Sequence, residues 1–388
     1  MGGVAYIYVL YAIHFDIMRN LKKLLLIIVI SSNVALGQTN FASCADKSIT
    51  TGNENELDSL TNLLIDKLDT KDFYLIGEAH TFLANNDFQF SLIKALHKLS
   101  VYNIANELPH STCFIFNQYL DTGNDSLLTL LKPSATYNIL KKVREFNQNQ
   151  QADKKIKYYG IDYIGAENDY SNYKISLRLI RDKIPSKNLP LDIFLDKYLR
   201  KENFLYQDIV EINDTLFLKL QSDSTIYKTH FGIYFDDLLL MASNMVGNKT
   251  NRDSNIFKSF SLLYRQLYQK QKSIPKFIAF YGMGHLDNFG NILLKDNKSP
   301  VKNSVCKIPI QYINCLGGWT TATFRNDGLY QISKNSLKNL IEYCKQNKWK
   351  IAFFKNTECF DFRKNSNADA IMIFNNYGDR KMNSWKFD

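Results

Sequence analysis

The sequence lacks the short motifs that mark the common hydrolase and nucleotide-binding sites. It contains no Gly-x-Ser-x-Gly, no His-Glu-x-x-His and no Gly-x-x-x-x-Gly-Lys-Ser/Thr, and Gly282-Met283-Gly284 lacks the third glycine of a dinucleotide-binding loop. Serine-hydrolase, zincin, P-loop and dinucleotide-binding functions are therefore unsupported.

The six cysteines include no Cys-x-x-Cys pair, which argues against a zinc-thiolate site and against a thioredoxin-like centre. Four of the six lie in the last quarter of the chain. One or two local disulfides are therefore expected there, for instance between Cys306 and Cys315, although spacing alone does not fix connectivity.

A long block of like charge is also absent. The net charge is +10, but the basic residues are dispersed in short runs such as Lys154-Lys155. This pattern is typical of a solvated basic surface, so no nucleic-acid partner is expected. Of the 388 residues 45% are hydrophobic, which is enough to bury a full globular core.

The amino-terminal region carries a targeting signal. After Met18, a cluster of basic residues precedes an apolar run over 24–36 and the small-x-small sequence Ala35-Leu36-Gly37. We interpret 18–37 as a signal peptide, 1–17 as lying upstream of the true start, and 38–54 as a linker. An amino-terminal membrane anchor is the alternative. The protein is then exported, to the periplasm, the cell surface or the medium, with no stable transmembrane segment after cleavage.

Strand and helix patterns alternate along the remainder of the chain. Apolar runs that end in glycine, proline or polar residues predict strands at 73–80, 102–109, 156–162, 277–285, 308–313, 351–354 and 370–374. Helical spacing of apolar residues separates most of them, and the segment 73–109 has the size of a β-α-β unit with a parallel pair of strands. We predict one α/β domain over 55–380, a three-layer α/β/α fold with a mostly parallel central sheet.

Residues 171–271 show almost no strand pattern. We therefore predict a helical insertion over about 165–250. Such an insertion could cover the carboxyl edge of the sheet as a lid.

Two predicted strands end in Gly-x-x-His, at Gly77-Glu78-Ala79-His80 and at Gly282-Met283-Gly284-His285. Ligands of open α/β sheets bind at the carboxyl ends of the strands, so both histidines are candidate site residues. Glu107 lies at the end of a third predicted strand and is a further candidate site residue. These four residues, Glu78, His80, Glu107 and His285, are the predicted catalytic groups.

The residue types allow two kinds of chemistry. A carboxylate beside a histidine fixes its tautomer and raises its basicity, which suits proton transfer. Alternatively, His80, His285 and a carboxylate, Glu78 or Glu107, are nitrogen and oxygen ligands for a divalent ion such as zinc, manganese or cobalt. Arg252 is a candidate clamp for an anionic group, or a partner in a helix-start salt bridge. Asp162 is a candidate substrate-binding residue, or a turn former.

The other histidines are weaker candidates. His110 lies at the predicted start of a helix shortly after Glu107. His97 lies on an apolar helix face and His230 precedes a helix, so both are interpreted as structural.

Several of these segments resemble the erythromycin esterase, ChaN-like and Tiki/TraB superfamily. The resemblance covers about residues 55–375 and is carried by Leu75–His80, Gln89–Leu96, Ala105–Glu107, Tyr159–Asp162, Arg252-Asp253, Ala279–Leu286 and Ala368–Phe374. It implies an α/β/α sheet with the site at the strand ends. In the esterases, the positions matching Glu78, His80, Glu107 and His285 activate water against an ester. In Tiki-type members the two Gly-x-x-His elements bind a divalent metal and cleave peptides, and ChaN-like members bind haem.

These observations lead to an expected exported hydrolase that acts on a small-molecule ester or a peptide. Arg252 is a candidate partner for the oxyanion or for a substrate carboxylate. The alternative is a protein of the same superfamily that binds haem or another small ligand without catalysis.

Overall fold

The computed structural model describes residues 18, 20–23, 41–80, 82, 84–131, 136–165, 167–185, 188–246, 251–313, 315, 332–355, 357–362, 367–375 and 377. The predicted signal peptide and the residues before it lie mostly outside these ranges. Within them, no helix is long and apolar enough to cross a membrane.

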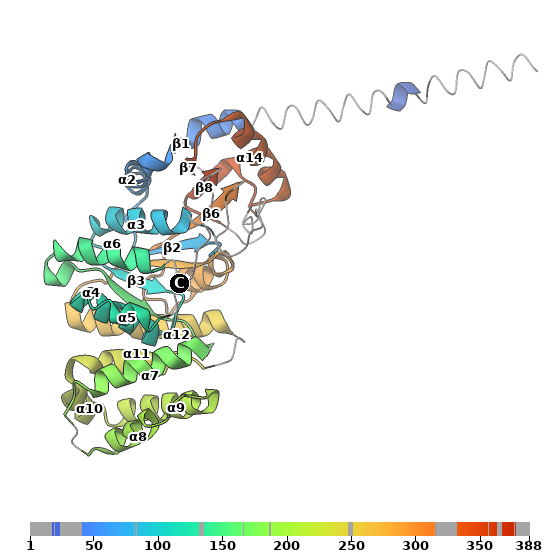
Figure 1. The fold of residues 1–388 in the computed structure, drawn as a ribbon. Helices are drawn as coiled ribbons and strands as arrows, with labels where there is room; N and C mark the ends of the chain where they lie inside the picture. The colour runs from blue at the N-terminus through green and yellow to red at the C-terminus, as the bar shows by residue number, and fades with distance from the viewer. Residues whose placement is uncertain are drawn as a thin grey trace, which may run out of the picture.

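An eight-stranded sheet runs through the domain in the order β1-β7-β8-β6-β2-β5-β3-β4 (Figure 1). Strands β6, β2, β5, β3 and β4 are mutually parallel, β8 continues in parallel beside β6, and β7 pairs in antiparallel fashion with both β8 and β1. The strands are β1 Ile49–Gly52, β2 Phe73–Glu78, β3 Asn103–Asn106, β4 Lys157–Gly160, β5 Phe277–Gly282, β6 Val305–Ile313, β7 Ile351–Phe354 and β8 Ile371–Asn375.

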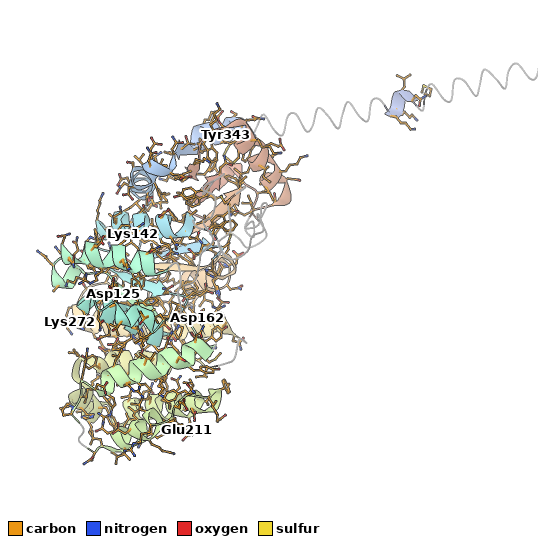
Figure 2. The ribbon with its side chains drawn as sticks, in the orientation of Figure 1. Asp125, Lys142, Asp162, Glu211, Lys272 and Tyr343 are labelled. Atoms are coloured by element: carbon orange, nitrogen blue, oxygen red, sulfur yellow. A yellow bond between two sulfur atoms is a disulfide. The ribbon has the colours of Figure 1, made fainter. Side chains whose placement is uncertain are left out.

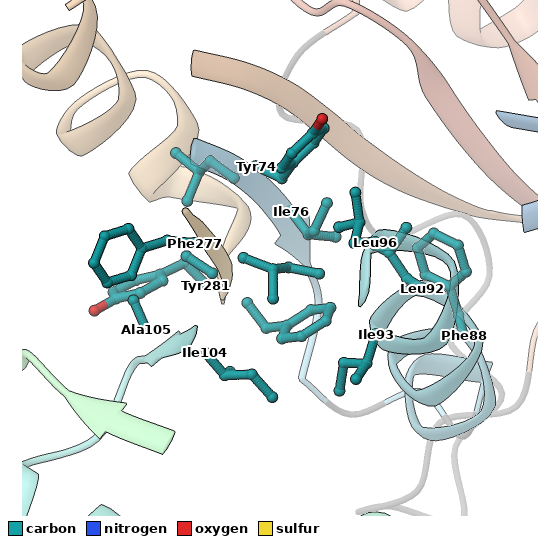
Figure 3. Close-up of a cluster of buried hydrophobic side chains, with 14 of the residues drawn as sticks. Tyr74, Ile76, Phe88, Leu92, Ile93, Leu96, Ile104, Ala105, Phe277 and Tyr281 are labelled. Carbon is teal, nitrogen blue, oxygen red and sulfur yellow. The ribbon is translucent and has the colours of Figure 1, made fainter. Parts of the chain in front are cut away.

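Helices cover both faces of the sheet, which confirms the predicted three-layer α/β/α fold with a mostly parallel sheet. Alternate residues of β2 point to opposite faces. Phe73 packs edge-on against Phe260 and Phe289, whereas Ile76 lies toward Leu92 and Leu96 (Figure 3). The helices around the sheet are α2 Leu57–Lys67, α3 Ala84–His97, α4 His110–Thr122, α5 Ser126–Thr129, α6 Thr136–Gln148, α12 Arg252–Gln271, α13 Phe289–Lys295 and α14 Lys334–Gln346.

The strands β2 and β3 are parallel, as predicted, but they are not a pair. Strand β5 lies between them and bonds to both. The expectation of a paired β-α-β unit was therefore wrong. The connection through α3 is long enough to pass over a strand, so a later segment of the chain could enter between the two.

The predicted helical insertion is present and has its own hydrophobic core. It leaves and rejoins the domain at a bridge between Ile164 and Val246. Its helices pack beside α4 and α12, beyond β4 (Figure 1). The insertion therefore extends the domain past the β4 edge. The expected lid over the carboxyl edge is wrong, because the insertion starts directly after β4, the outermost strand, and continues outward from it. The helices are α7 Glu167–Arg181, α8 Pro190–Leu199, α9 Tyr206–Ser222, α10 Ser224–Phe231 and α11 Phe235–Ser243.

The predicted linker over 38–54 is largely part of the fold. Residues 41–48 are helical, 49–52 form β1, and Phe41 is buried against Tyr343 and Phe360. A disulfide joins Cys44 to Cys359 across 315 residues. This segment therefore holds the carboxyl-terminal strands together.

The predicted Cys306–Cys315 bridge was wrong, because both cysteines are buried and neither forms a disulfide. Cys306 lies near the start of β6, whereas Cys315 follows its end. Seven or more extended residues separate their Cα atoms by roughly 25 Å, and a disulfide needs less than about 7 Å.

Candidate functional site

The two Gly-x-x-His segments meet because their strands are neighbours. In the parallel pairing of β2 with β5, Gly77 lies beside Tyr281 and Glu78 beside Gly282. Both strands stop at this carboxyl edge, and the chain turns from β5 into a short 3₁₀ helix, η4 Met283–Leu286. His80 and His285 therefore emerge at the same edge.

Two glycines allow the segments to approach closely. A Cβ atom at Gly77 would lie 2.2 Å from Leu286 Cδ1, so any side chain there would force Leu286 to shift. At Gly282 a Cβ atom would lie 3.1 Å from His80 Nε2 and 3.5 Å from Glu107 Oε2. The Gly282 amide donates a 2.5 Å hydrogen bond to the same carboxylate oxygen.

Each histidine is held at Nδ1 by its own carboxylate. His80 Nδ1 bonds Glu78 Oε1 at 3.1 Å, and His285 Nδ1 bonds Asp253 Oδ1 at 2.5 Å. Gln89 holds the second oxygen of Glu78 with a 2.7 Å bond from Nε2. Because a carboxylate at Nδ1 fixes the tautomer, Nε2 is the nitrogen left for chemistry in both rings.

Both Nε2 atoms face Glu107. His80 Nε2 lies 3.2 Å from Oε2, and His285 Nε2 lies 3.3 Å from Oε1. Arg252 Nη2 also donates to Oε1, at 2.7 Å. Glu107 is thus the central anion of the cluster, and its side chain is only 12% exposed.

The Arg252 side chain is held in place by two hydrogen bonds to Asp162. Its Nε donates to Asp162 Oδ1 at 3.0 Å and its Nη2 to the other oxygen, while the guanidinium lies over the Tyr163 ring. The Asp162 side chain is only 3% exposed, so the carboxylate that holds Arg252 is buried. The Arg252 side chain as a whole is 28% exposed, and Nη1 takes part in none of these bonds.

The charges in the cluster are unbalanced. Among the described residues, these contacts join four carboxylates, those of Glu78, Glu107, Asp162 and Asp253, to one permanent cation, Arg252, and the two imidazoles. With both imidazoles neutral, the sum is −4 + 1 = −3. Two protonated imidazoles bring it to −1, so the cluster favours imidazolium.

The pKa values follow this imbalance. Contacts with Glu107 and then Glu78 raise the pKa of His80 to about 10, against the effect of burial. Burial opposes protonation of His285, but Asp253 and Glu107 outweigh it and raise its pKa to about 9. Burial would raise the pKa of Glu107, yet its bonds with His285, His80 and Gly282 hold it well below its usual range.

His80 is the site residue with the most open side chain. Its exposed fraction is 50%, compared with 12% for His285 and 7% for Glu78. A group that exchanges a proton with a substrate or with water must be reachable from solvent. In this arrangement His80 faces solvent, and the other residues of the cluster lie behind it and hold its ring or its carboxylate partners in place.

Among the described residues, no group of three or more His, Cys, Asp or Glu side chains is arranged to hold a metal ion. All four ring nitrogens of His80 and His285 face carboxylate oxygens. The divalent ion and the haem stay predictions, with His80, His285 and Glu78 or Glu107 as the nitrogen and oxygen donors that would hold an ion.

Three other histidines of the described residues, His97, His110 and His230, lie away from this cluster. His110 is fully buried, bonds Asp237 Oδ1 at 2.9 Å and accepts from the Gly160 amide at 3.3 Å. His97 bonds the Lys154 carbonyl, and His230 bonds Asp192 inside the insertion. All three make structural contacts.

Sequence reasoning missed Asp253 as a site residue. The sequence marks it only as part of the Arg252-Asp253 segment of the resemblance, yet its carboxylate bonds His285 Nδ1. The available signal was the acidic residue in the first turn of α12, directly before strand β5 and its histidine.

The fold of this chain has counterparts among solved structures. No protein-family model and no curated protein matches the sequence. Among solved structures, an erythromycin esterase, EreC, in its open conformation matches with a TM-score of 0.55 and 12% identity, over 84% of this chain and 97% of that chain. This chain shares its fold with an erythromycin esterase.

Two further structures match over 87% of this chain and 97% of theirs. A Bacillus cereus protein has a TM-score of 0.57 at 12% identity, and a succinoglycan biosynthesis protein has 0.58 at 11% identity. The resemblance predicted from the sequence is therefore confirmed at the level of the fold. A haem-binding ChaN from Campylobacter jejuni reaches a TM-score of only 0.27, which carries no argument about haem.

Proposed function

We propose that this protein is a hydrolase in which His80 exchanges protons with water and with the leaving group of an ester. The observation that carries the proposal is the half-exposed His80 ring, held at Nδ1 by Glu78 and directed by Nε2 toward Glu107. Carboxylate-held imidazoles of this kind are general acid–base groups. The fold shared with an erythromycin esterase supports the ester class.

The proposed reaction runs through the neutral form of His80. Its Nε2 takes a proton from water while the water oxygen attacks the ester carbonyl carbon. The resulting imidazolium is stabilised by Glu78 and Glu107, and it returns the proton to the leaving alkoxide oxygen when the carbon–oxygen bond breaks. The products are a carboxylic acid and an alcohol, so atoms and protons balance.

The surrounding cations have supporting roles in the proposal. Protonated His285 and Arg252 offset the charge of Glu107, so that the carboxylate does not repel a developing oxyanion. Arg252 has 28% exposure and an Nη1 outside its carboxylate bonds. It is the candidate for contact with the oxyanion or with a substrate carboxylate.

A panel of small-molecule esters and peptides tests this function. Wild-type protein should hydrolyse at least one ester, and His80→Ala and His285→Ala should each lower kcat/KM. Turnover of peptides alone would move the substrate class from esters to amides. Activity that survives both substitutions would refute the role of the cluster.

The metal and haem predictions are tested on the same protein. Elemental analysis of the purified protein for zinc, manganese and cobalt, repeated on His285→Ala, detects a bound ion that depends on the site. An absorption spectrum with a Soret band would instead favour the ligand-binding alternative. We propose no reaction step through either group.

Export remains part of the proposal. The Cys44–Cys359 disulfide supports it, because structural disulfides persist in oxidising compartments. Detection of the protein outside the cytoplasm, with the amino terminus beginning after Gly37, would test both export and the cleavage position.

A further inference from the structure

The edge of the sheet opposite the candidate site is strongly basic. Five parallel strands, β6, β2, β5, β3 and β4, begin there. We call the segments leading into them, residues 68–72, 98–102, 149–157, 270–276 and 296–304, the amino edge. They contain ten lysines and four aspartates, a net charge of 10 − 4 = +6 out of +10 for the whole chain.

Backbone and side-chain contacts join these segments into one surface. The Phe277 amide donates to the Asp72 carbonyl at 2.8 Å, and the Asp72 amide to the Ser304 carbonyl at 3.1 Å. Lys276 Nζ reaches the Leu99 carbonyl at 3.1 Å. Five neighbouring strands span four inter-strand spacings, so the basic surface is about 20 Å wide.

The lysines of the amino edge are not neutralised by ion pairs. Among the described residues, none of them lies within ion-pair distance of a carboxylate. The end of α4 brings Asp121 and Asp125 nearby, where Arg144 contacts the turn at Gly123. The surface as a whole stays positive.

Two large apolar side chains are exposed in and just before the segment 270–276. Tyr268 is 50% exposed and Ile274 is 57% exposed, and they flank Lys270 and Lys272. An exposed aromatic and an aliphatic side chain among lysines is typical of surfaces that enter the headgroup region of a bilayer.

Lys272 occupies a backbone position at which glycine is the usual residue. It ends α12 with φ +56°, in the left-handed region, and its amide bonds the Tyr268 carbonyl at 2.9 Å. Glycine is the common residue at such a position because it has no Cβ atom to strain. Here a positive charge is present despite that strain.

We propose that the amino edge docks the protein on an anionic phospholipid surface. The lysines supply the attraction to lipid phosphates, and Tyr268 and Ile274 enter the interface. The apolar pair favours a bilayer over a nucleic acid, which offers no apolar layer to enter. The candidate site lies at the opposite edge and faces away from the membrane; Lys272 and Asp162 mark the two sides in Figure 2.

The test is cosedimentation of the full chain with vesicles of phosphatidylcholine, with and without phosphatidylglycerol. The readout is the ratio of the two partition coefficients, which removes any binding that the two kinds of vesicle share, and the variants below separate the amino edge from the basic residues of the leader. The ratio should exceed one and should fall as salt is added. A ratio of one, or binding to double-stranded DNA without preference for anionic vesicles, would overturn the proposal.

Substitutions locate the surface. The triple variant Lys154→Gln, Lys155→Gln, Lys157→Gln should lower anionic-vesicle binding by about fivefold for each lysine. The matched triple variant Lys197→Gln, Lys219→Gln, Lys228→Gln, in the helical insertion, should retain binding. Equal losses in the two would show unspecific charge attraction and refute the surface.

Two further variants separate docking from folding. Tyr268→Ser with Ile274→Ser should weaken binding to anionic vesicles while keeping its salt dependence. Lys272→Gly should raise the melting temperature, because glycine relaxes the left-handed turn, and should still lower binding. A more stable Lys272→Gly protein with undiminished binding would contradict the proposal.

Discussion

His80 directs its Nε2 at Oε2 of Glu107 across 3.2 Å, although their strands, β2 and β3, are separated in the sheet by β5. The contact forms because both residues lie just beyond strand ends on one edge, and because Gly282 of the intervening strand has no side chain to separate them. A carboxylate with a low pKa beside a histidine with a high one defines the proton chemistry of the site.

Replacement of His80 by glutamine should abolish most hydrolysis. Glutamine keeps a polar side chain between Glu78 and Glu107 but cannot carry a proton, so kcat/KM should fall by about 10²- to 10⁴-fold. The control is His97→Gln, since His97 bonds a backbone carbonyl far from the cluster. Equal activity of the two variants would contradict the role of His80.

The pH dependence should report the raised pKa of His80. Because its pKa is about 10, the neutral form that accepts a proton is a minor species at neutral pH. As a general base, His80 should make kcat/KM rise about tenfold per pH unit until the pH approaches this pKa. A profile that is flat at neutral pH and falls only above it would assign His80 as an acid instead.

Glu107→Gln provides the matched variant for this profile. Removing the carboxylate takes away the first cause of the raised pKa, so the rising limb should move to lower pH. An unmoved limb would show that another group titrates.

The strand-end rule explains how much of the site could be predicted. Gly77 and Gly282 end apolar runs in the sequence, and parallel strands end at one edge, so Glu78, His80 and His285 were expected together. The position of β5 between β2 and β3 was not predictable, because chain order does not determine which distant strand enters a sheet.

Other features depend on contacts between residues far apart in the chain. Cys44 and Cys359 are 315 residues apart, and no spacing rule pairs them. The lysines of the amino edge are dispersed in the sequence, and only the parallel strands collect them on one surface. Asp253 acquires its role from the position of η4 beside α12, which local sequence does not encode.

Loss of the disulfide should destabilise the carboxyl-terminal strands. Cys44→Ser with Cys359→Ser should lower the free energy of unfolding by about 2–4 kcal/mol, since the bond closes a long loop of the unfolded chain. Urea denaturation with and without reductant measures this, and reductant should not affect the double variant. In the unfolded, unreduced wild type, four of six cysteines should react with an alkylating agent; six would refute the bond.

Glu107→Gln should also destabilise the folded protein, and the effect should depend on pH. The variant leaves Arg252 and two imidazolium groups without their shared, largely buried anion, a loss of about 3 kcal/mol at neutral pH. The pKa of Glu107 is lowered by folding, so its contribution is present above its ordinary pKa of 4.5 and is lost as the pH falls toward the depressed value.

Urea denaturation of both proteins from neutral to acidic pH checks this prediction. The difference in unfolding free energy should be nearly constant between about pH 6 and the ordinary pKa of Glu107, where the histidines are protonated in both states, and should shrink below that pKa. The control is Glu145→Gln on the exposed side of α6, which should change stability by less than about 0.5 kcal/mol at every pH. If the Glu107 difference were unchanged in acid, the carboxylate would not be ionised in the folded protein. The network of His80, His285 and Arg252 around it would then need another explanation.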